Sequence, residues 1–362
     1  IFIILFFHIT PVMQNNFHTT GTDTLNTFYT EEDFVALKKF DVHTHVNTHN
    51  PAMIELAKKY NFGLLSINVD VPGYPALEKQ QDFTTDHLQK NKGHFGYITS
   101  FRINNLDVPG WLEQTIRYLS HSFNRGALGV KVWKNIGMEY RYNNNAFVMI
   151  DDVKLDPVFE FIEKNNKTLL GHLGEPRNCW LPLAEMTVAN DREYFEQHPE
   201  YHMYLHPEFP SYEDQIAARD HMLKKHPGMR FVGAHLASLE WSTDEIAKRL
   251  EAFPNMAVDM AERISHLQYQ TVHEYEKVRD FFLKYQNRLL YSTDLSLDDS
   301  MDISAFLHNA GTTWKKHWKF FTSNEMMEAP EVKKPFRGLH LPKAVINKLY
   351  LTNAANWYPG LI

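Results

Sequence analysis

The chain has 362 residues, of which 43% are hydrophobic and 14% aromatic, and its formal net charge at pH 7 is −7. This composition is typical of a globular protein with a substantial core, and the acidic charge argues against a nucleic-acid-binding surface. The single cysteine, Cys179, excludes an intrachain disulfide and a cluster of thiolate ligands, so any metal ion must be held by nitrogen or oxygen donors.

We divide the chain into an N-terminal segment, 1–37, and one domain, 38–362. The N-terminal segment begins with an apolar run from Ile1 to Phe7 that is too short to span a bilayer. We favour the end of a signal peptide, which predicts a periplasmic or secreted protein. The alternative is upstream sequence with Met13 as the true start, which predicts a cytoplasmic protein. No other segment approaches transmembrane length, so no membrane span is expected.

Short apolar runs rich in β-branched residues alternate along the chain with helical patterns. The predicted strands lie at 40–46, 62–71, 93–101, 127–133, 167–173, 229–236, 255–260 and 288–294. Helical periodicity is found at 52–60, 111–123, 158–166, 242–253 and 278–285. Eight strands that alternate with helices predict a (β/α)8 TIM barrel.

Several residues predict where these helices begin and end. Gly126 is placed to end the helix before it, and Pro254 ends a later one. Asp156 is expected to be an N-cap. Ser242 and Glu245 have the spacing of a capping box.

Two long loop inserts interrupt the alternation, at 176–213 after the fifth strand and at 295–341 after the eighth. The first is crowded with aromatic residues and histidines. In a barrel both would follow the carboxyl ends of strands, where the catalytic face lies. We therefore expect the first insert to close over the barrel mouth.

Polar residues stand at the ends of these otherwise apolar strands. His43 and His45 share one face of the first strand, because strand side chains alternate. The others are Lys131 on the fourth strand, His172 on the fifth, His235 on the sixth and Asp294 on the eighth. A charged group costs several kcal/mol at such a place unless it is paired or metal-bound. Each of these residues taken alone could have a purely structural role, such as capping a helix. Their concentration at one rim of the barrel instead indicates a functional site.

This combination resembles the amidohydrolase superfamily, specifically its amidohydrolase-2 branch of metal-dependent hydrolases and decarboxylases. That branch carries His-x-His on strand 1, histidines on strands 5 and 6, and an aspartate on strand 8. The resemblance covers roughly 38–359, including a closing helix with an Asn-Ala pair at 353–354. It implies that the metal ligands are His43, His45, His172 and Asp294. It also implies that Asp294 is a ligand or a base, and that His235 polarises or protonates the substrate.

The chemistry of these side chains agrees with that implication. Neutral imidazoles and a carboxylate suit one Zn²⁺ with a position left open for water, whose pKa the metal lowers to about 7. We therefore expect metal-bound hydroxide to attack a small polar ester, lactone or amide. Non-oxidative decarboxylation of a carboxylic acid uses the same ligands and stays open. A barrel that only binds its small-molecule partner has no need for His235 and Asp294. The sequence leaves open whether the chain forms a homo-oligomer.

Further candidates for substrate contact lie near the same rim. One alternative for Lys131 is a carboxylated lysine that bridges two metals. The other is an interior lysine paired with Asp294 or Glu262. We predict one metal and an unmodified lysine that orients the substrate or Asp294. Glu175 either orients His172 or forms an ion pair with Arg177.

Arg263 follows the seventh strand and is expected to face the substrate. Trp133, like other tryptophans of the chain, either lines the pocket or packs in the core.

Overall fold

The computed structural model describes residues 27–362. The expectations for Ile1–Phe7 and Met13 fall outside this range. Among the described residues, no helix combines the length and apolar character that crossing a bilayer requires.

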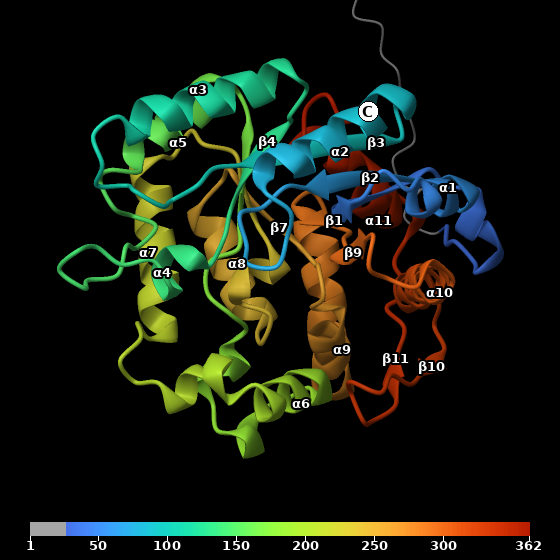
Figure 1. Ribbon diagram of the computed structural model, residues 1–362. Helices are drawn as coiled ribbons and strands as arrows, with labels where there is room; N and C mark the ends of the chain where they lie inside the picture. Colours follow the sequence, from blue (N-terminus) through green and yellow to red (C-terminus); the bar gives the residue numbers. More distant parts are fainter. Residues whose placement is uncertain (1–26) are drawn as a thin grey trace, which may run out of the picture.

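Parallel strands form one curled sheet at the centre of the molecule (Figure 1). The strands are β1 (Lys39–Asn47), β2 (Phe62–Ile67), β3 (Phe95–Ser100), β4 (Gly129–Val132), β5 (Thr168–Gly171), β6 (Phe231–Gly233), β7 (Met256–Asp259), β8 (Leu289–Leu290) and β9 (Leu295–Asp298). Their order in the sheet is β8-β7-β6-β5-β4-β3-β2-β1-β9. Each of the eight predicted strands is present, and nearly all are shorter than predicted.

The last strand position is shared by two short strands and closes the ring. β8 pairs with β7, and β9, which follows β8 after four intervening residues, pairs with β1. Between them, the backbone of Tyr291 and Asp294 also bonds to β1, through the Val42 N–H and the His43 carbonyl. The break at residues 291–294 is therefore a local irregularity in one strand, and the sheet has the arrangement of a TIM barrel.

Helices surround the strands on the outside (Figure 1). They are α1 (Ala52–Lys59), α2 (Leu77–Lys90), α3 (Trp111–Asn124), α4 (Asn135–Met138), α5 (Asp156–Lys164), α6 (Ala189–Gln197), α7 (Tyr212–Lys225), α8 (Thr243–Ala252), α9 (Ile264–Tyr285), α10 (Ile303–Thr322), α11 (Lys343–Asn347) and α12 (Asn353–Trp357). The predicted helices are all found, and α2, α4, α6, α7 and α10 are additions to them.

The predicted helix ends are confirmed in part. Gly126 has a φ of +100° just after α3, a conformation that glycine adopts without strain. Asp156 is not an N-cap, because the helix begins at this residue and its carboxylate pairs with Lys225 of α7. The capping box before α8 is half formed: the Ser242 side chain accepts from the Glu245 N–H, whereas the Glu245 carboxylate binds basic side chains of the same helix.

At the amino-terminal ends of the strands, the barrel interior is filled by apolar side chains from the strands and from the C-terminal segment. Leu65, Leu170 and Val232 belong to this interior cluster together with Tyr358 and Leu361. The C-terminal residues thus close this end of the barrel, and the polar side chains gather at the opposite end, beyond the carboxyl ends of the strands.

An irregularity in β1 decides which way its histidines point. The pairing register with β2 shifts between Asp41 and Thr44. Asp41 faces outward, where its carboxylate accepts a hydrogen bond of 2.9 Å from the Trp314 indole of α10. In a regular strand His43 would share that outward face. The bulge instead turns His43 and, two residues later, His45 into the barrel.

The two predicted inserts contain helices. The segment between β5 and α7 folds into α6 and several short 3-10 helices, at the bottom of Figure 1. The first residues of the predicted second insert, 295–298, form β9 and so belong to the barrel; the rest continues as α10 and includes the two-stranded hairpin β10 (Met326–Met327) and β11 (Phe336–Arg337).

Candidate metal centre

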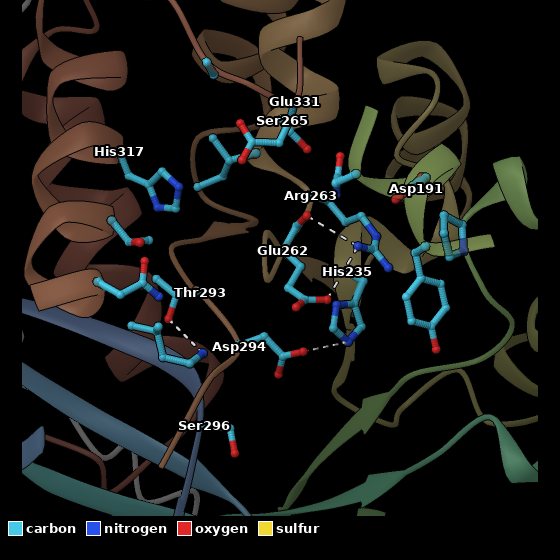
Figure 2. Close-up of a pocket in the computed structure, with 18 of the residues that line it drawn as sticks. Asp191, His235, Glu262, Arg263, Ser265, Thr293, Asp294, Ser296, His317 and Glu331 are labelled. Carbon is cyan, nitrogen blue, oxygen red and sulfur yellow. Dashed lines mark hydrogen bonds and ion pairs between the residues drawn. The ribbon is translucent and has the colours of Figure 1, made fainter. Parts of the chain in front are cut away.

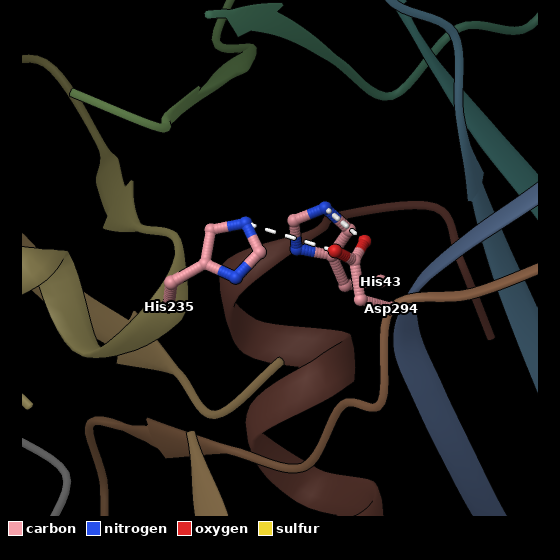
Figure 3. Close-up of side chains that lie close together, drawn as sticks. All are labelled: His43, His235 and Asp294. Carbon is pink, nitrogen blue, oxygen red and sulfur yellow. Dashed lines mark ion pairs between the residues drawn. The ribbon is translucent and has the colours of Figure 1, made fainter. Parts of the chain in front are cut away.

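Three side chains from different strand positions meet at the end of the barrel where the strands have their carboxyl ends (Figure 3). Within residues 27–362, His43, His235 and Asp294 form the group whose donor atoms all lie within 4.8 Å of one another. The His43 Nε2 lies 3.2 Å from Asp294 Oδ1, and the His235 Nε2 lies 3.9 Å from Asp294 Oδ2. The group combines imidazole nitrogens and a carboxylate, which are ligands that zinc prefers.

His45 lies beside this group, with its Nε2 3.1 Å from Asp294 Oδ1. The two histidines of β1 therefore share one carboxylate oxygen, as the alternation of side chains on the strand predicts. His172 lies at the edge of the group and is half-buried; its ring centroid is 4.1 Å from that of His235. Of the four predicted ligands, His43, His45 and Asp294 thus lie in contact, whereas His172 lies next to His235. His235, which was predicted to face the substrate, is itself in the group of close donor atoms.

A hydrogen-bond acceptor at each Nδ1 atom fixes the orientation of three of these rings. The Nδ1 of His43 is 2.8 Å from Asp259 Oδ2, that of His45 is 2.8 Å from the Ile67 carbonyl, and that of His235 is 3.0 Å from the Ala261 carbonyl. An acceptor at Nδ1 places the ring proton there and leaves the Nε2 lone pair for the centre. All three histidines therefore present Nε2 to the same space.

Uncharged imidazoles and an ionised carboxylate are the stable forms in this centre, for different reasons. Burial and the nearby Lys131 lower the pKa of His43. Burial also lowers the pKa of His172 and of His235 well below the usual histidine value. For Asp294 burial opposes ionisation, but His43 and the other neighbouring histidines hold its pKa well below the usual range. Neutral rings and one carboxylate are the protonation states that metal binding requires.

Asp259, at the end of β7, is part of the centre and was not among the predicted residues. It is fully buried, and besides His43 it accepts a hydrogen bond of 2.9 Å from the backbone N–H of His235. One carboxylate thus positions two of the histidines. The signal was present in the sequence, because Asp259 ends an apolar strand as the other rim residues do.

Lys131 is buried and donates to the centre itself. Its Nζ lies 3.2 Å from the His43 Nε2. Among the described residues its partner is His43, and it forms no ion pair with Asp294 or Glu262; an unmodified lysine that orients the substrate or Asp294 stays a prediction. Burial lowers its pKa to about 8, which still leaves most of the amine protonated at pH 7.

Replacing Lys131 with methionine is expected to leave one equivalent of metal bound, at least as tightly as in the parent. The change removes a positive charge and a donor that competes with the ion for the His43 Nε2. Turnover should fall by about 10²-fold, because a positive charge next to the reacting groups is removed. Metal analysis of parent and variant tests this. Two equivalents in the parent, with one lost in the variant, would contradict a mononuclear centre.

A pocket of about 1090 Å³ opens above the centre (Figure 2). It is lined by His172, His235 and Asp294 from the barrel and by residues of α6, α9 and α10. α6 comes from the predicted first insert, which therefore forms one wall of the pocket.

Charged side chains surround this pocket. Arg263 lines it and is buried, and its Nε has no hydrogen-bond partner among the described residues. Its nearest carboxylate is that of Glu262, at 3.6 Å, on a side chain that is 57% exposed and projects into the pocket (Figure 2). Because this ion pair is loose and partly solvated, the guanidinium keeps donors for another acceptor.

Glu175 also lines the pocket, but neither predicted partner of Glu175 is confirmed. Its carboxylate pairs with Lys134, the residue after the fourth predicted strand. Arg177 instead stacks on the Trp241 ring at 4.2 Å. Lys134 was missed by the sequence interpretation. Trp133 is half-buried and is not among the residues that line the pocket.

Three residues around the pocket have left-handed backbone conformations. The φ angles of His235, Glu262 and Asp294 are +56°, +55° and +69°. For residues other than glycine this conformation costs about 1–2 kcal/mol each. Such strain concentrates at functional sites, where the surrounding structure holds it.

Comparison with known proteins places these features in a family. The model of the Amidohydrolase family matches residues 99–360. An uncharacterised TIM-barrel protein from Bordetella bronchiseptica is 12% identical, with 90% of this chain and 99% of that chain covered, at a TM-score of 0.53. A structure of amidohydrolase II is 14% identical (88% and 99% covered, TM-score 0.51). One of 2,6-dihydroxybenzoate decarboxylase complexed with 2,6-dihydroxybenzoate is also 14% identical (88% and 98% covered, TM-score 0.50).

At these identities the likeness shows the shared fold. No curated protein sequence matches the chain.

Proposed function

Because the chain belongs to the Amidohydrolase family, whose metal-dependent members include hydrolases and decarboxylases, we propose that it hydrolyses a small polar ester, lactone or amide with one divalent metal ion. The observation that carries the proposal is the convergence of three Nε2 atoms on the Asp294 carboxylate, each with its Nδ1 held by an acceptor. Zinc fits best, since the donors are imidazoles and a carboxylate without a thiolate.

The two oxygens of Asp294 support a division of roles. Oδ1 faces both histidines of β1, at 3.2 and 3.1 Å, whereas Oδ2 faces His235 at 3.9 Å. We assign Oδ1, His43 and His45, completed by His172, to the metal. Oδ2 and His235 then lie on the substrate side. A bound divalent ion would lower the pKa of a water molecule and polarise the substrate carbonyl.

The side chains then move the protons of the reaction. As water adds to the carbonyl carbon, its proton passes to Asp294 Oδ2. The same proton is later delivered to the leaving oxygen or nitrogen when the bond to the carbonyl carbon breaks, so the carboxylate is regenerated. His235, with its own N–H directed to the Ala261 carbonyl, keeps Nε2 toward the reacting group. On the far side of the pocket, Arg263 would orient a substrate oxygen.

Decarboxylation of a carboxylic acid is the second candidate. Arg263 favours it, because a buried guanidinium with an unpartnered Nε suits a carboxylate. Lys134 favours it less, since its charge is already paired with Glu175.

A substrate screen on protein loaded with zinc separates these possibilities. Esters, lactones, amides and aromatic acids would be offered, and both hydrolysis products and released CO2 measured. Hydrolysis that is lost with a chelator and restored by zinc supports the proposal. Release of CO2 favours the second candidate. Tight metal binding with no turnover of any class would favour a barrel that only binds.

Replacing His235 with glutamine tests the division of roles. The variant is expected to keep one equivalent of metal and lose about 10²- to 10⁴-fold in turnover, as for a residue that acts in proton transfer. Metal analysis and kcat are the measurements, with circular dichroism as the check of folding. A folded variant without metal would make His235 a ligand and move His172 to the substrate side.

A further inference from the structure

The backbone that carries His235 is left-handed over four consecutive residues. The φ angles of His235, Leu236, Ala237 and Ser238 lie between +55° and +58°. None of them is glycine, and L-residues adopt this conformation as single residues rather than in runs. The turn also folds back tightly on β6, because a Cβ at Gly233 would lie 2.4 Å from the Cβ of Ala237. A run of this kind persists only where its surroundings hold it.

Two side chains of α7 hold the carbonyl groups of this turn. The Arg219 guanidinium donates from Nη1 to the Ala237 carbonyl at 2.5 Å. The Tyr212 hydroxyl donates to the Ser238 carbonyl at 2.5 Å. Both side chains are buried, and both bonds end on the last two residues of the turn. The Ser238 hydroxyl adds a bond of 3.0 Å to the Leu173 carbonyl, after β5.

Arg219 is itself fixed by its neighbours. It is 1% exposed, and its Nε and Nη2 donate to Asp220 Oδ1 at 3.1 and 2.7 Å. The other oxygen of Asp220 accepts from Arg249 of α8 at 3.1 Å. A buried arginine is costly to keep for packing alone, and this one donates from Nη1 to a main-chain carbonyl of the turn.

At the other end of the turn, His235 is held only by the barrel. Its N–H donates to Asp259 and its Nδ1 to the Ala261 carbonyl. If the turn relaxed toward right-handed backbone, the direction of the Cα–Cβ bond at His235 would change. The ring could then no longer satisfy both bonds and face Asp294.

We propose that Arg219 and Tyr212 are positioning residues, which hold the 235–238 turn left-handed and so keep the His235 ring directed at Asp294. The expected effect of these residues on turnover rests on the proposed function, whereas their effect on the orientation of the His235 ring does not. The inference concerns residues that touch neither the metal ligands nor the substrate pocket.

The test uses Tyr212→Phe, which removes one oxygen atom, together with Arg219→Met and Arg219→Lys. Arg249→Gln is the matched control, because it disturbs the same Asp220 network without touching the turn. The first readout is the NMR spectrum of metal-free protein labelled in its histidine rings, with the His235 signal assigned from His235→Gln. The second is kcat and KM of the zinc-loaded enzyme on the best substrate of the screen.

Tyr212→Phe and Arg219→Met are expected to shift the His235 ring signal and lower kcat by about 10²-fold with KM nearly unchanged. Arg219→Lys should recover part of both, since lysine still reaches a carbonyl, and Arg249→Gln should change neither. An unmoved His235 signal in the folded variants, or the same shift in the control, would overturn the proposal. If Arg219→Met fails to fold, Tyr212→Phe decides alone. A shifted signal in a protein without turnover would refute the proposed function and leave the positioning role standing.

Discussion

Replacing Asp294 with asparagine is expected to abolish both metal binding and turnover. The carboxylate touches both histidines of β1 through Oδ1 and faces His235 through Oδ2, so one substitution removes the negative ligand and the proton carrier together. The loss of the proton carrier alone corresponds to about 10²- to 10⁴-fold in kcat. Metal content after dialysis and kcat with added zinc measure the two effects separately.

Asp298→Asn is a matched control for this experiment. Asp298 ends β9, four residues after Asp294, and its carboxylate caps the following turn by accepting from the Ser300 N–H at 2.8 Å. It should keep metal and activity. Full metal occupancy in the Asp294 variant would show that the ion is held elsewhere, and would remove the basis of the proposed centre.

Asp259→Asn is expected to weaken metal binding by about 10- to 100-fold, although Asp259 does not face the ion. In the parent, the carboxylate accepts the proton on the His43 Nδ1. An amide NH2 turned to that position would favour the other tautomer, with the proton on Nε2, where it blocks coordination. The same change of tautomer explains why the aspartate of a serine-protease triad cannot be replaced by asparagine.

The measurement is zinc titration of metal-free protein, with the His43 tautomer read from the nitrogen chemical shifts of the ring. Asp41→Asn is the control, because this carboxylate is equally buried but faces outward, toward Trp314 and Thr293. Both variants should lose stability, by about 1–3 kcal/mol, since each disturbs a buried hydrogen-bonded carboxylate. Only the Asp259 variant should change the tautomer. Equal zinc affinity in that variant and in the control would refute the positioning role of Asp259.

The fold was predictable because parallel barrel strands are buried on both faces and so appear as short apolar runs. All eight strands were found in this way. α2 was missed for the opposite reason: its buried face carries Gln80, Gln81, Thr84 and Thr85. Gln80 accepts from the Val69 N–H and donates to its carbonyl, so the polar face is satisfied by a neighbouring loop. A hydrophobic periodicity cannot reveal a helix that packs through hydrogen bonds.

The sequence by itself determined which side chains gather at the rim of the barrel. Strand ends are marked by local patterns, and parallel strands bring their carboxyl ends to the same side. Only the tertiary structure decided how those side chains pair. His43 and Asp259 are 216 residues apart, and their contact depends on strand order and on the bulge that turns His43 inward. Likewise, Lys131 of β4 bonds to His43 of β1 across the barrel, and Lys134 after β4 bonds to Glu175 after the neighbouring strand β5. Such contacts are set by the register of distant strands, which no local pattern of residues contains.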